Sequence, residues 1–392
     1  MLPMNEMRSH LTEKILPFWE SLLDSVNGGF CGFVGHDLGR DWLASKGCIL
    51  NSRILWTFST AARVLKDDSL LVYARQALRF LEKFIDREHG GVIWSVTFDG
   101  RPLDTTKHTY NQAFAIYALS AYARATGDQQ ALDIAMTIFH LIEDRCTDSG
   151  GYGEAFNQDF SPEDNEKLSE NGVLAARTMN TLLHIVEAYA ELYRAVHDEQ
   201  VQTCGTWALE LIRKKMFNRE AARLDVFFDS DYHSLIDMQS YGHDIEASWL
   251  LWDAAETFLT QDEQLPIRSL CLTLADSVLT RAMTDMGLLN ECVRGINNGM
   301  RIWWVQAEAV LGFSNAYRIS GAGDYRLAAQ NIWKYIKKVM VDPRPGGEWF
   351  WSVFETGVPS ESPVVEPWKC PYHNSRMCLR ILEQDMEIVE RS

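Results

Sequence analysis

Hydrophobic residues recur along most of this chain at the three- and four-residue spacing of amphipathic helices. Between these stretches lie paired glycines, which end helices, and short alternating aromatic runs, which are typical of small strands or hairpin arms. The pattern predicts twelve helices in six consecutive pairs. They cover residues 6–24, 49–66, 68–86, 108–126, 128–146, 171–197, 198–217, 243–260, 262–283, 301–320, 322–340 and 371–389.

The paired glycines repeat at a regular interval. Pairs begin at Gly28, Gly90 and Gly150, about 60 residues apart, and the pair at Gly346 follows after about three more periods. Helical hairpins of about 65 residues are compatible with an open solenoid or with a closed toroid. The toroid is favoured, because the second helix of each pair opens with polar and aromatic residues where a solenoid core would be apolar. We therefore expect an all-α toroid of six hairpins with short β-hairpins in the loops, forming one domain over residues 1–392.

The second helix of every pair begins with a cluster of polar and aromatic side chains. Taken singly, each cluster has a structural explanation, such as a surface ion pair for Arg53 or a hydrogen-bonded core histidine for His184. In a toroid, however, all six clusters converge on one mouth. The clusters are Asn51 to Trp56, Lys107 to Asn111, Asn180 with His184, His243 with Glu246, Arg301 to Glu308, and Trp368 to Asn374.

His243 and Glu246 form the clearest candidate for proton-transfer chemistry. Gly242 ends a loop, and Ile245 and Trp249 then follow at helical spacing. His243 and Glu246 are therefore expected on one face of a first helical turn, where they can act as an acid/base pair. A surface pair that helps to start the helix is the alternative when these two residues are considered alone.

Composition narrows the class of partner. The net charge of −17 argues against nucleic acid and against an anionic membrane surface, and it favours a small neutral substrate. The chain has 13 Trp, 13 Tyr and 18 Phe, and indole rings stack on the C–H faces of sugars while polar neighbours bond the hydroxyls. This points to a carbohydrate site, although aromatic-rich cores also occur without a ligand. No nucleotide-binding or metal-binding sequence motif is present.

The eight cysteines and the first twelve residues indicate the cellular compartment of the protein. None of the cysteines forms a C-x-x-C pair, and their spread through helical segments is typical of free thiols in a reducing cytoplasm. The first twelve residues carry charges without the apolar stretch of a secretory signal, and no segment has the roughly 18 apolar residues of a membrane span. We therefore expect a cytoplasmic protein.

The clusters also carry a family resemblance. With the segments 46–56, 107–111, 168–172, 240–249, 303–308 and 368–378, the chain resembles the N-acylglucosamine 2-epimerase superfamily, and within it the cellobiose 2-epimerases. The resemblance extends nearly end to end. It implies an (α/α)6 barrel, no cofactor, no essential metal, and a monomer or weak homodimer. One departure is Ser375, where the family commonly has glycine.

The resemblance also implies roles for individual residues. His243 and His373 would be the acid/base pair, with His184 and Glu246 in support. The positions that match the family's substrate contacts are Arg53, Tyr110, Asn180, Trp303, Trp304, Glu308 and Trp368.

The implied reaction is reversible epimerisation at C2 of the reducing-end glucose of a β-1,4-linked disaccharide. Cellobiose would give glucosyl-mannose, and lactose would give epilactose. The sugar ring must open first, because the free aldehyde acidifies the C2 proton. Two imidazoles on opposite sides of that carbon can then remove and return the proton through an enediolate, whose charge Arg53 would stabilise.

Three alternatives stay open. A monosaccharide or N-acylglucosamine 2-epimerase, or an aldose–ketose isomerase, would use the same enediolate. A glycoside hydrolase would need two carboxylates across the scissile bond, for which Glu170, Glu246 and Glu308 are candidates. A scaffold of helical repeats without activity would leave the polar clusters unexplained.

Overall fold

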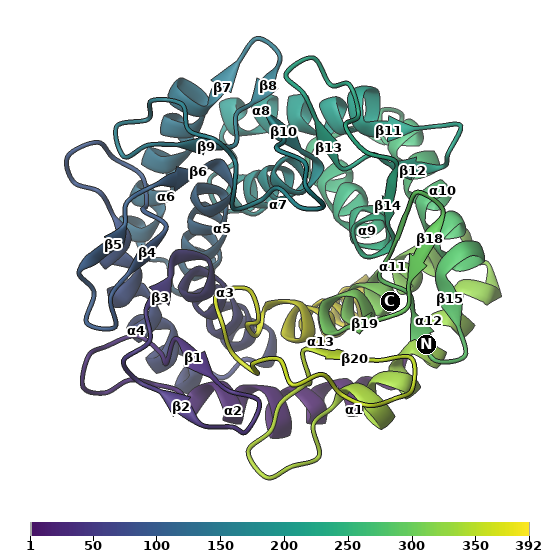
Figure 1. The fold of residues 1–392 in the computed structure, drawn as a ribbon, viewed down its shortest axis with the longest axis horizontal. Coiled ribbons are helices and arrows are strands. Elements are labelled where there is room, and N and C mark those ends of the chain that lie inside the picture. Colours follow the sequence, from purple (N-terminus) through teal and green to yellow (C-terminus); the bar gives the residue numbers. More distant parts are fainter. Residues whose placement is uncertain (1, 392) are drawn as a thin grey trace.

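The helices form two concentric rings, and the inner ring is closed (Figure 1). The computed structural model describes residues 2–391, with side chains up to residue 384. Each inner helix contacts the next, and the last one returns to contact the first. This confirms the predicted all-α (α/α)6 barrel. The inner helices are α3 (Cys48–Leu65), α5 (Thr109–Thr126), α7 (Met179–Val196), α9 (Tyr241–Phe258), α11 (Trp303–Ser320) and α13 (Tyr372–Arg391).

The outer helices are amphipathic, and each packs one face on the inner ring. In α4, for example, Ala74, Ala77 and Phe80 are buried at helical spacing. The inner helices are instead buried around most of their circumference. The outer helices are α1 (Met4–His10), α2 (Leu16–Glu20), α4 (Leu71–Leu81), α6 (Gln129–Leu141), α8 (Glu199–Leu211), α10 (Leu265–Ala282) and α12 (Gly323–Tyr335). A π-helical turn, Leu11–Ile15, joins α1 to α2. Similar turns follow α6, α8 and α12, at Ile142–Cys146, Ile212–Met216 and Ile336–Met340. Two 3₁₀ turns, Asp68–Leu70 and Glu82–Phe84, flank α4.

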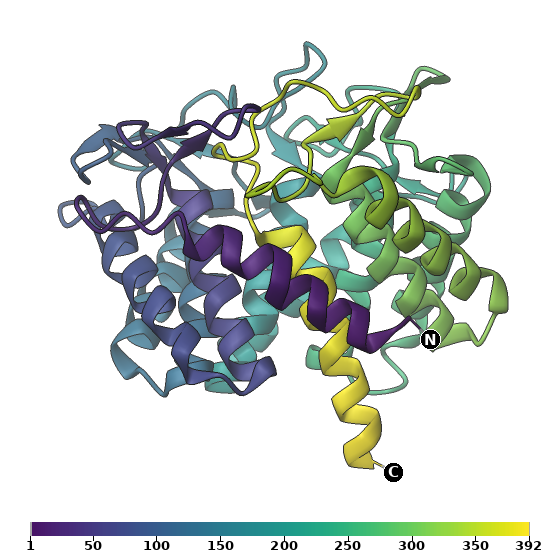
Figure 2. The ribbon, with the colours of Figure 1, turned by 90° about the horizontal axis from the view of Figure 1, so that it is seen from below.

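The short strands gather at one end of the ring, as Figure 2 shows. The strand that leads into an inner helix pairs antiparallel with a strand from the next repeat: β3 (Lys46–Gly47) with β4 (Ser95–Val96), β6 (Lys107–His108) with β9 (Ala155–Phe156), β10 (Arg177–Thr178) with β13 (Phe227–Phe228), β14 (Met238–Ser240) with β17 (Glu291–Val293), and β19 (Arg301–Ile302) with β20 (Ser352–Val353). A bridge between Val34 and Val365 joins the last loop to the first. The loops therefore form a continuous rim around the mouth.

The remaining strands are hairpin arms within single loops. They are β1 (Phe33–Val34) with β2 (Arg40–Asp41), β7 (Thr147–Asp148) with β8 (Gly151–Tyr152), β11 (Phe217–Asn218) with β12 (Arg223–Leu224), β15 (Met283–Thr284) with β16 (Gly287–Leu288), and the outer strands β5 (Pro102–Asp104) and β18 (Ile296–Asn298). The alternating runs at residues 92–96 and 349–353, which predicted short strands, contain β4 and β20.

A buried cation fastens four of the inner helices to the loop before them. Lys46, just before α3, donates to Asp24 at 2.9 Å and to the carbonyl of Gly28 at 2.7 Å. Lys107, before α5, binds Asp86 and Gly90 in the same way. Arg177 with Asp148, before α7, and Lys369 with Glu348, before α13, repeat the pairing. The paired glycines therefore belong to a repeated ion-pair turn as well as ending helices.

One predicted boundary is wrong. The helix expected over residues 171–197 begins only at Met179. Asn171 and Gly172 have φ values of +57° and +75°, which a helix excludes, and Arg177 and Thr178 pair with β13 instead. Among the described residues no helix is both long and apolar enough to cross a bilayer. The single domain over residues 1–392 stays a prediction.

Candidate active site

The starts of the six inner helices surround a cavity of about 370 Å³. Every predicted site residue except Glu308 lines it: Arg53, Tyr110, Asn180, His184, His243, Glu246, Trp303, Trp304, Trp368 and His373. The loops add Lys167, Glu170, Asn290, Glu291 and Trp351, among others. The volume is in the range of small-molecule sites, and the lining mixes flat aromatic faces with a few polar groups.

The two candidate acid/base histidines lie in first helical turns. His243 is the third residue of α9, and Ser240 caps that helix by accepting a bond from the backbone N–H of His243. His373 is the second residue of α13. Because both helices start at the same end of the ring, both imidazoles reach the same cavity.

Trp304 joins the two histidines across the cavity wall. Its ring centroid lies 4.9 Å from that of His243 and 5.5 Å from that of His373. Trp303 is almost fully buried beneath the site, with the ammonium of Lys369 over its ring and His373 at its edge. Of the two adjacent tryptophans, Trp304 is the more exposed and offers the larger face to a ligand.

Each of the three cavity histidines has a defined partner on Nδ1. The carboxylate of Glu308 lies 2.7 Å from Nδ1 of His373, and that of Glu187 lies 2.8 Å from Nδ1 of His184. A carboxylate can only accept, so these bonds place the proton on Nδ1 and leave Nε2 with a lone pair. Nδ1 of His243 instead meets the hydroxyl of Ser240 at 2.8 Å, and a hydroxyl can donate or accept.

Both acid/base candidates are held in the neutral form. Burial lowers the pKa of His243 to about 3. Burial also takes the pKa of His373 well below its usual value, helped by Arg376 and Arg53. The positive ends of α9 and α13 favour neutral imidazole as well. A neutral imidazole can accept a proton, as the proposed base must.

Arg53 provides positive charge at the cavity wall. It donates to the hydroxyl of Tyr110 at 2.9 Å, and its guanidinium lies over the rings of Phe114 and Tyr372. Its Nε is buried without a partner among the described residues. Asn180 likewise has an unpartnered buried Oδ1.

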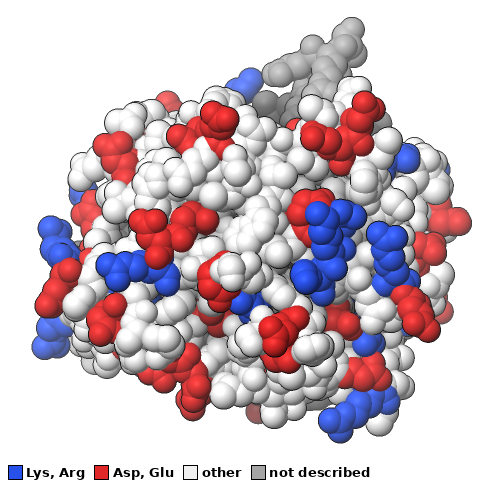
Figure 3. All heavy atoms as spheres, turned by 90° about the horizontal axis from the view of Figure 1, so that it is seen from above, with Lys and Arg blue, Asp and Glu red and all other residues white. Residues whose placement is uncertain are grey.

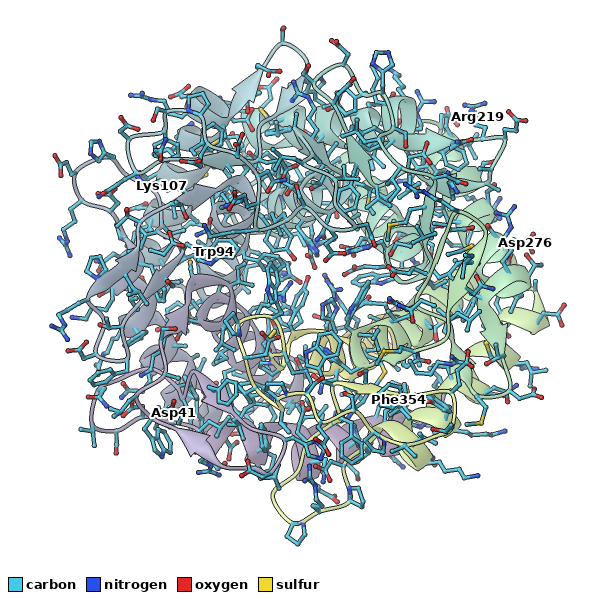
Figure 4. All side chains as sticks on the ribbon, in the orientation of Figure 1. Asp41, Trp94, Lys107, Arg219, Asp276 and Phe354 are labelled. Carbon is cyan, nitrogen blue, oxygen red and sulfur yellow. The ribbon has the colours of Figure 1, made fainter. Side chains whose placement is uncertain are left out.

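Trp368, another predicted substrate contact, packs against a second aromatic side chain. Its ring lies 5.9 Å from that of Trp94, which also contacts His108. Trp94 lies near the inner edge of the ring in Figure 4. The ammonium of Lys167 lies 5.4 Å from the centre of the Trp94 ring. Trp368 therefore has a rigid aromatic base.

Beneath the cavity, one arginine gathers three carboxylates. Arg376 is fully buried; it donates to Glu187, to Glu308 at 2.7 Å, and to Glu246. Burial and neighbouring Glu308 raise the pKa of Glu246 to about 7, and burial also raises the pKa of Glu308. Despite its burial, Glu187 has a lowered pKa, because of Arg376 and the bond from His184.

The carboxylates and His373 could by spacing hold a metal ion. Ligand atoms of Glu246, Glu308 and His373 lie within 4.8 Å of one another. The guanidinium of Arg376 already contacts both carboxylates, however, and supplies the positive charge that this donor set needs. These residues therefore fit a resident arginine, and the expected absence of a metal stays a prediction.

The structure places Glu308 behind His373, whereas the sequence analysis predicted that Glu308 contacts the substrate. Its two oxygens bind His373, Arg376 and Trp249, and none of its surface is exposed. Sequence reasoning missed Glu187, Ser240 and Arg376 altogether. Each of these lies three positions from a cavity histidine along the same helix or its cap, and that spacing is the signal that could have found them.

Comparison with known proteins adds the following. Residues 39–376 match the profile of the N-acylglucosamine 2-epimerase (GlcNAc 2-epimerase) family. The cellobiose 2-epimerase of Eubacterium cellulosolvens is 51% identical, over 96% of this chain and 98% of its own. The solved structure of cellobiose 2-epimerase from Bacillus thermoamylovorans is 42% identical in sequence and superposes with a TM-score of 0.95, over 97% of this chain and 99% of that one. A D-mannose isomerase shares the fold, with a TM-score of 0.83 over 97% of both chains, at 19% identity.

Proposed function

This chain belongs to the N-acylglucosamine 2-epimerase family, and we propose that it interconverts the C2 epimers at the reducing end of β-1,4-linked disaccharides. Cellobiose would give glucosyl-mannose, and lactose would give epilactose. The observation that carries the proposal is the pair of imidazoles, His243 and His373, joined by Trp304 in one cavity. Two such groups are what removal and return of one proton require.

The proton is transferred in two steps. Once the sugar ring is open, the aldehyde acidifies the C2–H bond, and one imidazole takes that proton through its free ring nitrogen. The electron pair of the C–H bond moves into the enediolate. The other histidine enters this step as an imidazolium: the proton on its ring nitrogen goes to the opposite face of C2, the electron pair of the enediolate forms the new C–H bond, and this histidine becomes neutral. Exchange of protons with water restores both histidines before the next turnover. Neutral imidazole is needed for the first step, and the lowered pKa values supply it.

Arg53 and Glu246 support the steps on either side of proton transfer. The enediolate carries negative charge, and Arg53 lines the cavity beside Tyr110 as one of its cations. A positioned donor of this kind contributes about 3 to 4 kcal/mol to a barrier. Glu246, whose pKa lies near 7, can give and take a proton at neutrality and so assist ring opening together with His184.

The pair Glu246 and Glu308 does not have the arrangement that hydrolysis of a glycosidic bond needs. Glu246 and Glu308 both bind the same Nη2 of Arg376, and Glu308 does not line the cavity. A hydrolase instead places its two carboxylates on either side of the bond, about 5 to 9.5 Å apart.

Incubation of the enzyme with cellobiose in D2O tests the proposal. We expect glucosyl-mannose, with deuterium at C2 of both epimers and an intact glycosidic bond, as read by NMR and mass spectrometry. A ketose with deuterium at C1 would identify an isomerase, and free glucose would identify a hydrolase. Either result as the main product would overturn the proposal, and so would activity on mannose or N-acetylglucosamine but not on cellobiose.

We further propose that the protein acts in the reducing cytoplasm, as a monomer or weak homodimer, on an oligosaccharide and without nucleic acid or membrane partners. All eight cysteines are free thiols, which supports a reducing compartment. On the face in Figure 3, acidic and basic side chains are interspersed, without the basic patch that a polyanion would need. Cell fractionation and analytical ultracentrifugation at several concentrations test location and assembly.

A further inference from the structure

We propose that Arg376 is the positioning residue of this site. Through the carboxylates of Glu187 and Glu308, it fixes the proton of two catalytic histidines on Nδ1. The two histidines are His184 and His373. The inference deepens the proposed function and rests on it only for the catalytic role of the two histidines. Its test measures the position of their ring protons and does not depend on that role.

The contacts form two chains that start from one guanidinium. Nη1 of Arg376 binds Glu187, whose other oxygen lies 2.8 Å from Nδ1 of His184. Nη2 binds Glu308 at 2.7 Å, and the same oxygen of Glu308 lies 2.7 Å from Nδ1 of His373. Nη2 also lies 3.4 Å from Nδ1 of His373 itself, but the oxygen of Glu308, at 2.7 Å, is the nearer partner of that nitrogen. Arg376 does not line the cavity, so it acts on the substrate only through these groups.

The charges explain why an arginine is needed. Glu187, Glu246 and Glu308 are all at most 4% exposed, and a buried carboxylate without a cation takes up a proton. A protonated Glu308 would donate its own O–H to Nδ1 of His373. The ring proton would then have to move to Nε2, and His373 would lose the lone pair that a base needs. Arg376 keeps Glu187 and Glu308 as acceptors and thereby prevents this exchange.

Lysine cannot replace this arginine. The guanidinium presents a planar fork, which reaches different carboxylates with Nη1 and Nη2, whereas an ammonium is a single point on a flexible stem. R376K therefore keeps the charge and loses at least one of the two chains. The hydroxyl of Tyr372, which also contacts Glu187 and Arg376, cannot restore the charge.

His243 is the internal control. Its Nδ1 partner is the hydroxyl of Ser240, which has no contact with Arg376. Arg380 provides the matched control substitution. It lies one turn further along α13, and it pairs with Asp253 and Glu383, neither of which binds a histidine.

The experiment is ¹⁵N NMR of histidine-labelled protein at pH 6 to 9, with His184, His243 and His373 assigned from single His→Gln variants. The two ring nitrogens of a neutral imidazole have well-separated shifts, so the tautomer is read directly. In the wild type we expect His184 and His373 with the proton on Nδ1. In R376K at least one of them becomes a mixture of tautomers, while His243 keeps its wild-type signals. R380K should leave all three unchanged.

Activity provides the second measurement. We expect R376K to lower kcat on cellobiose about 10- to 100-fold with KM nearly unchanged. Losses of this size are typical when a residue that orients metal ligands or catalytic groups by hydrogen bonds is replaced. R380K should keep kcat within about twofold of the wild type.

Three results would overturn the proposal. The first is a wild type in which His184 or His373 carries its proton on Nε2, a measurement that needs no variant to fold. The second is R376K with unchanged tautomers at both histidines. The third is an equal change at His243, which would mean general loosening of the site. If the tautomers behave as expected but cellobiose is not epimerised, the proposed function fails and the role of Arg376 in fixing the tautomers stands.

Discussion

Each end of the inner ring holds a network of arginine and carboxylate side chains, and the two networks differ in burial and in the ratio of cations to anions. The network at the mouth is buried, whereas the one at the opposite end is partly exposed. At the mouth, Glu187, Glu246 and Glu308 share the guanidinium of Arg376. At the opposite end, near the C-termini of the inner helices, cations and anions alternate in a chain. That chain contains Arg124, Glu191, Arg194, Asp253, Arg380, Glu383 and Arg63.

The pKa values of the carboxyl groups differ between the two networks. Near the mouth, burial and neighbouring Glu308 raise the pKa of Glu246 to about 7. At the opposite end, Arg124 and Arg194 lower the pKa of Glu191 despite its burial, and Arg194 and Arg380 lower that of Asp253. Glu246, in the network with more carboxylates than cations, can therefore gain or lose a proton near neutral pH. Glu191 and Asp253, in the network with paired charges, stay ionised there. The two networks therefore differ both in the number of cations per carboxylate and in the direction in which the pKa values of Glu246, Glu191 and Asp253 are shifted.

The largest expected effect is at the mouth. H243A and H373A should each lower kcat/KM on cellobiose by at least about 10³-fold, because each removes a proton-transfer group. Circular dichroism should show an intact fold. H140A, on the outer helix α6, is the control and should retain full activity. If either cavity variant keeps near wild-type activity, the reaction does not take place at the mouth.

The next effect is on stability as a function of pH. The folded-state pKa of Glu246 is raised from 4.5 to about 7, so the folded state binds the extra proton and wild-type stability falls as pH rises through this window. Glutamine mimics the protonated acid. E246Q should match the wild type near pH 4.5 and exceed its unfolding free energy at pH 8 by about 2 to 3 kcal/mol. Urea titrations across this range measure the difference, and a parallel pair of curves would contradict the raised pKa.

The opposite end should respond with the opposite sign. The pKa of Asp253 is lowered in the folded state, so its stabilisation is present above its unfolded value near 4 and disappears as pH falls below it. D253N should lower the unfolding free energy at pH 7 by about 1 to 2 kcal/mol, with no loss near pH 2. Epimerase activity should change less than about twofold. A large loss of kcat would show that the two networks are coupled.

The smallest expected effect is that of metal removal. Because Arg376 supplies the cation for Glu246 and Glu308, dialysis against EDTA should leave kcat on cellobiose unchanged. Restoration of a lost activity by added Mn²⁺ or Zn²⁺ would contradict the absence of an essential metal. Atomic emission analysis of the dialysed protein completes the experiment.

The fold was accessible from the sequence because its signals are local. Helical periodicity and the repeated glycines predicted six hairpins, and the polar helix starts predicted that they close into a ring. The error at residues 171–178 arose where helical periodicity in the sequence yielded to strand pairing between Arg177 and Phe228, which is a contact between repeats. Such pairing leaves no mark in a window of neighbouring residues.

The candidate site was predicted less completely. The side chains that face the cavity stood out because polar and aromatic residues are unusual in an inner helix. Glu308 carried the same signal but lies behind His373, because the direction of a side chain within a buried helix depends on its neighbours. Arg376 was missed, because its partners come from three other helices and lie up to 189 residues away along the chain.

The contact between α13 and α3 has a consequence for biosynthesis. His373 enters the cavity from the helix that a ribosome makes after the other five of the inner ring. A nascent chain that still lacks this helix has an open wall and only one of the two imidazoles. On the proposed mechanism, we therefore expect fragments released by premature termination to be inactive.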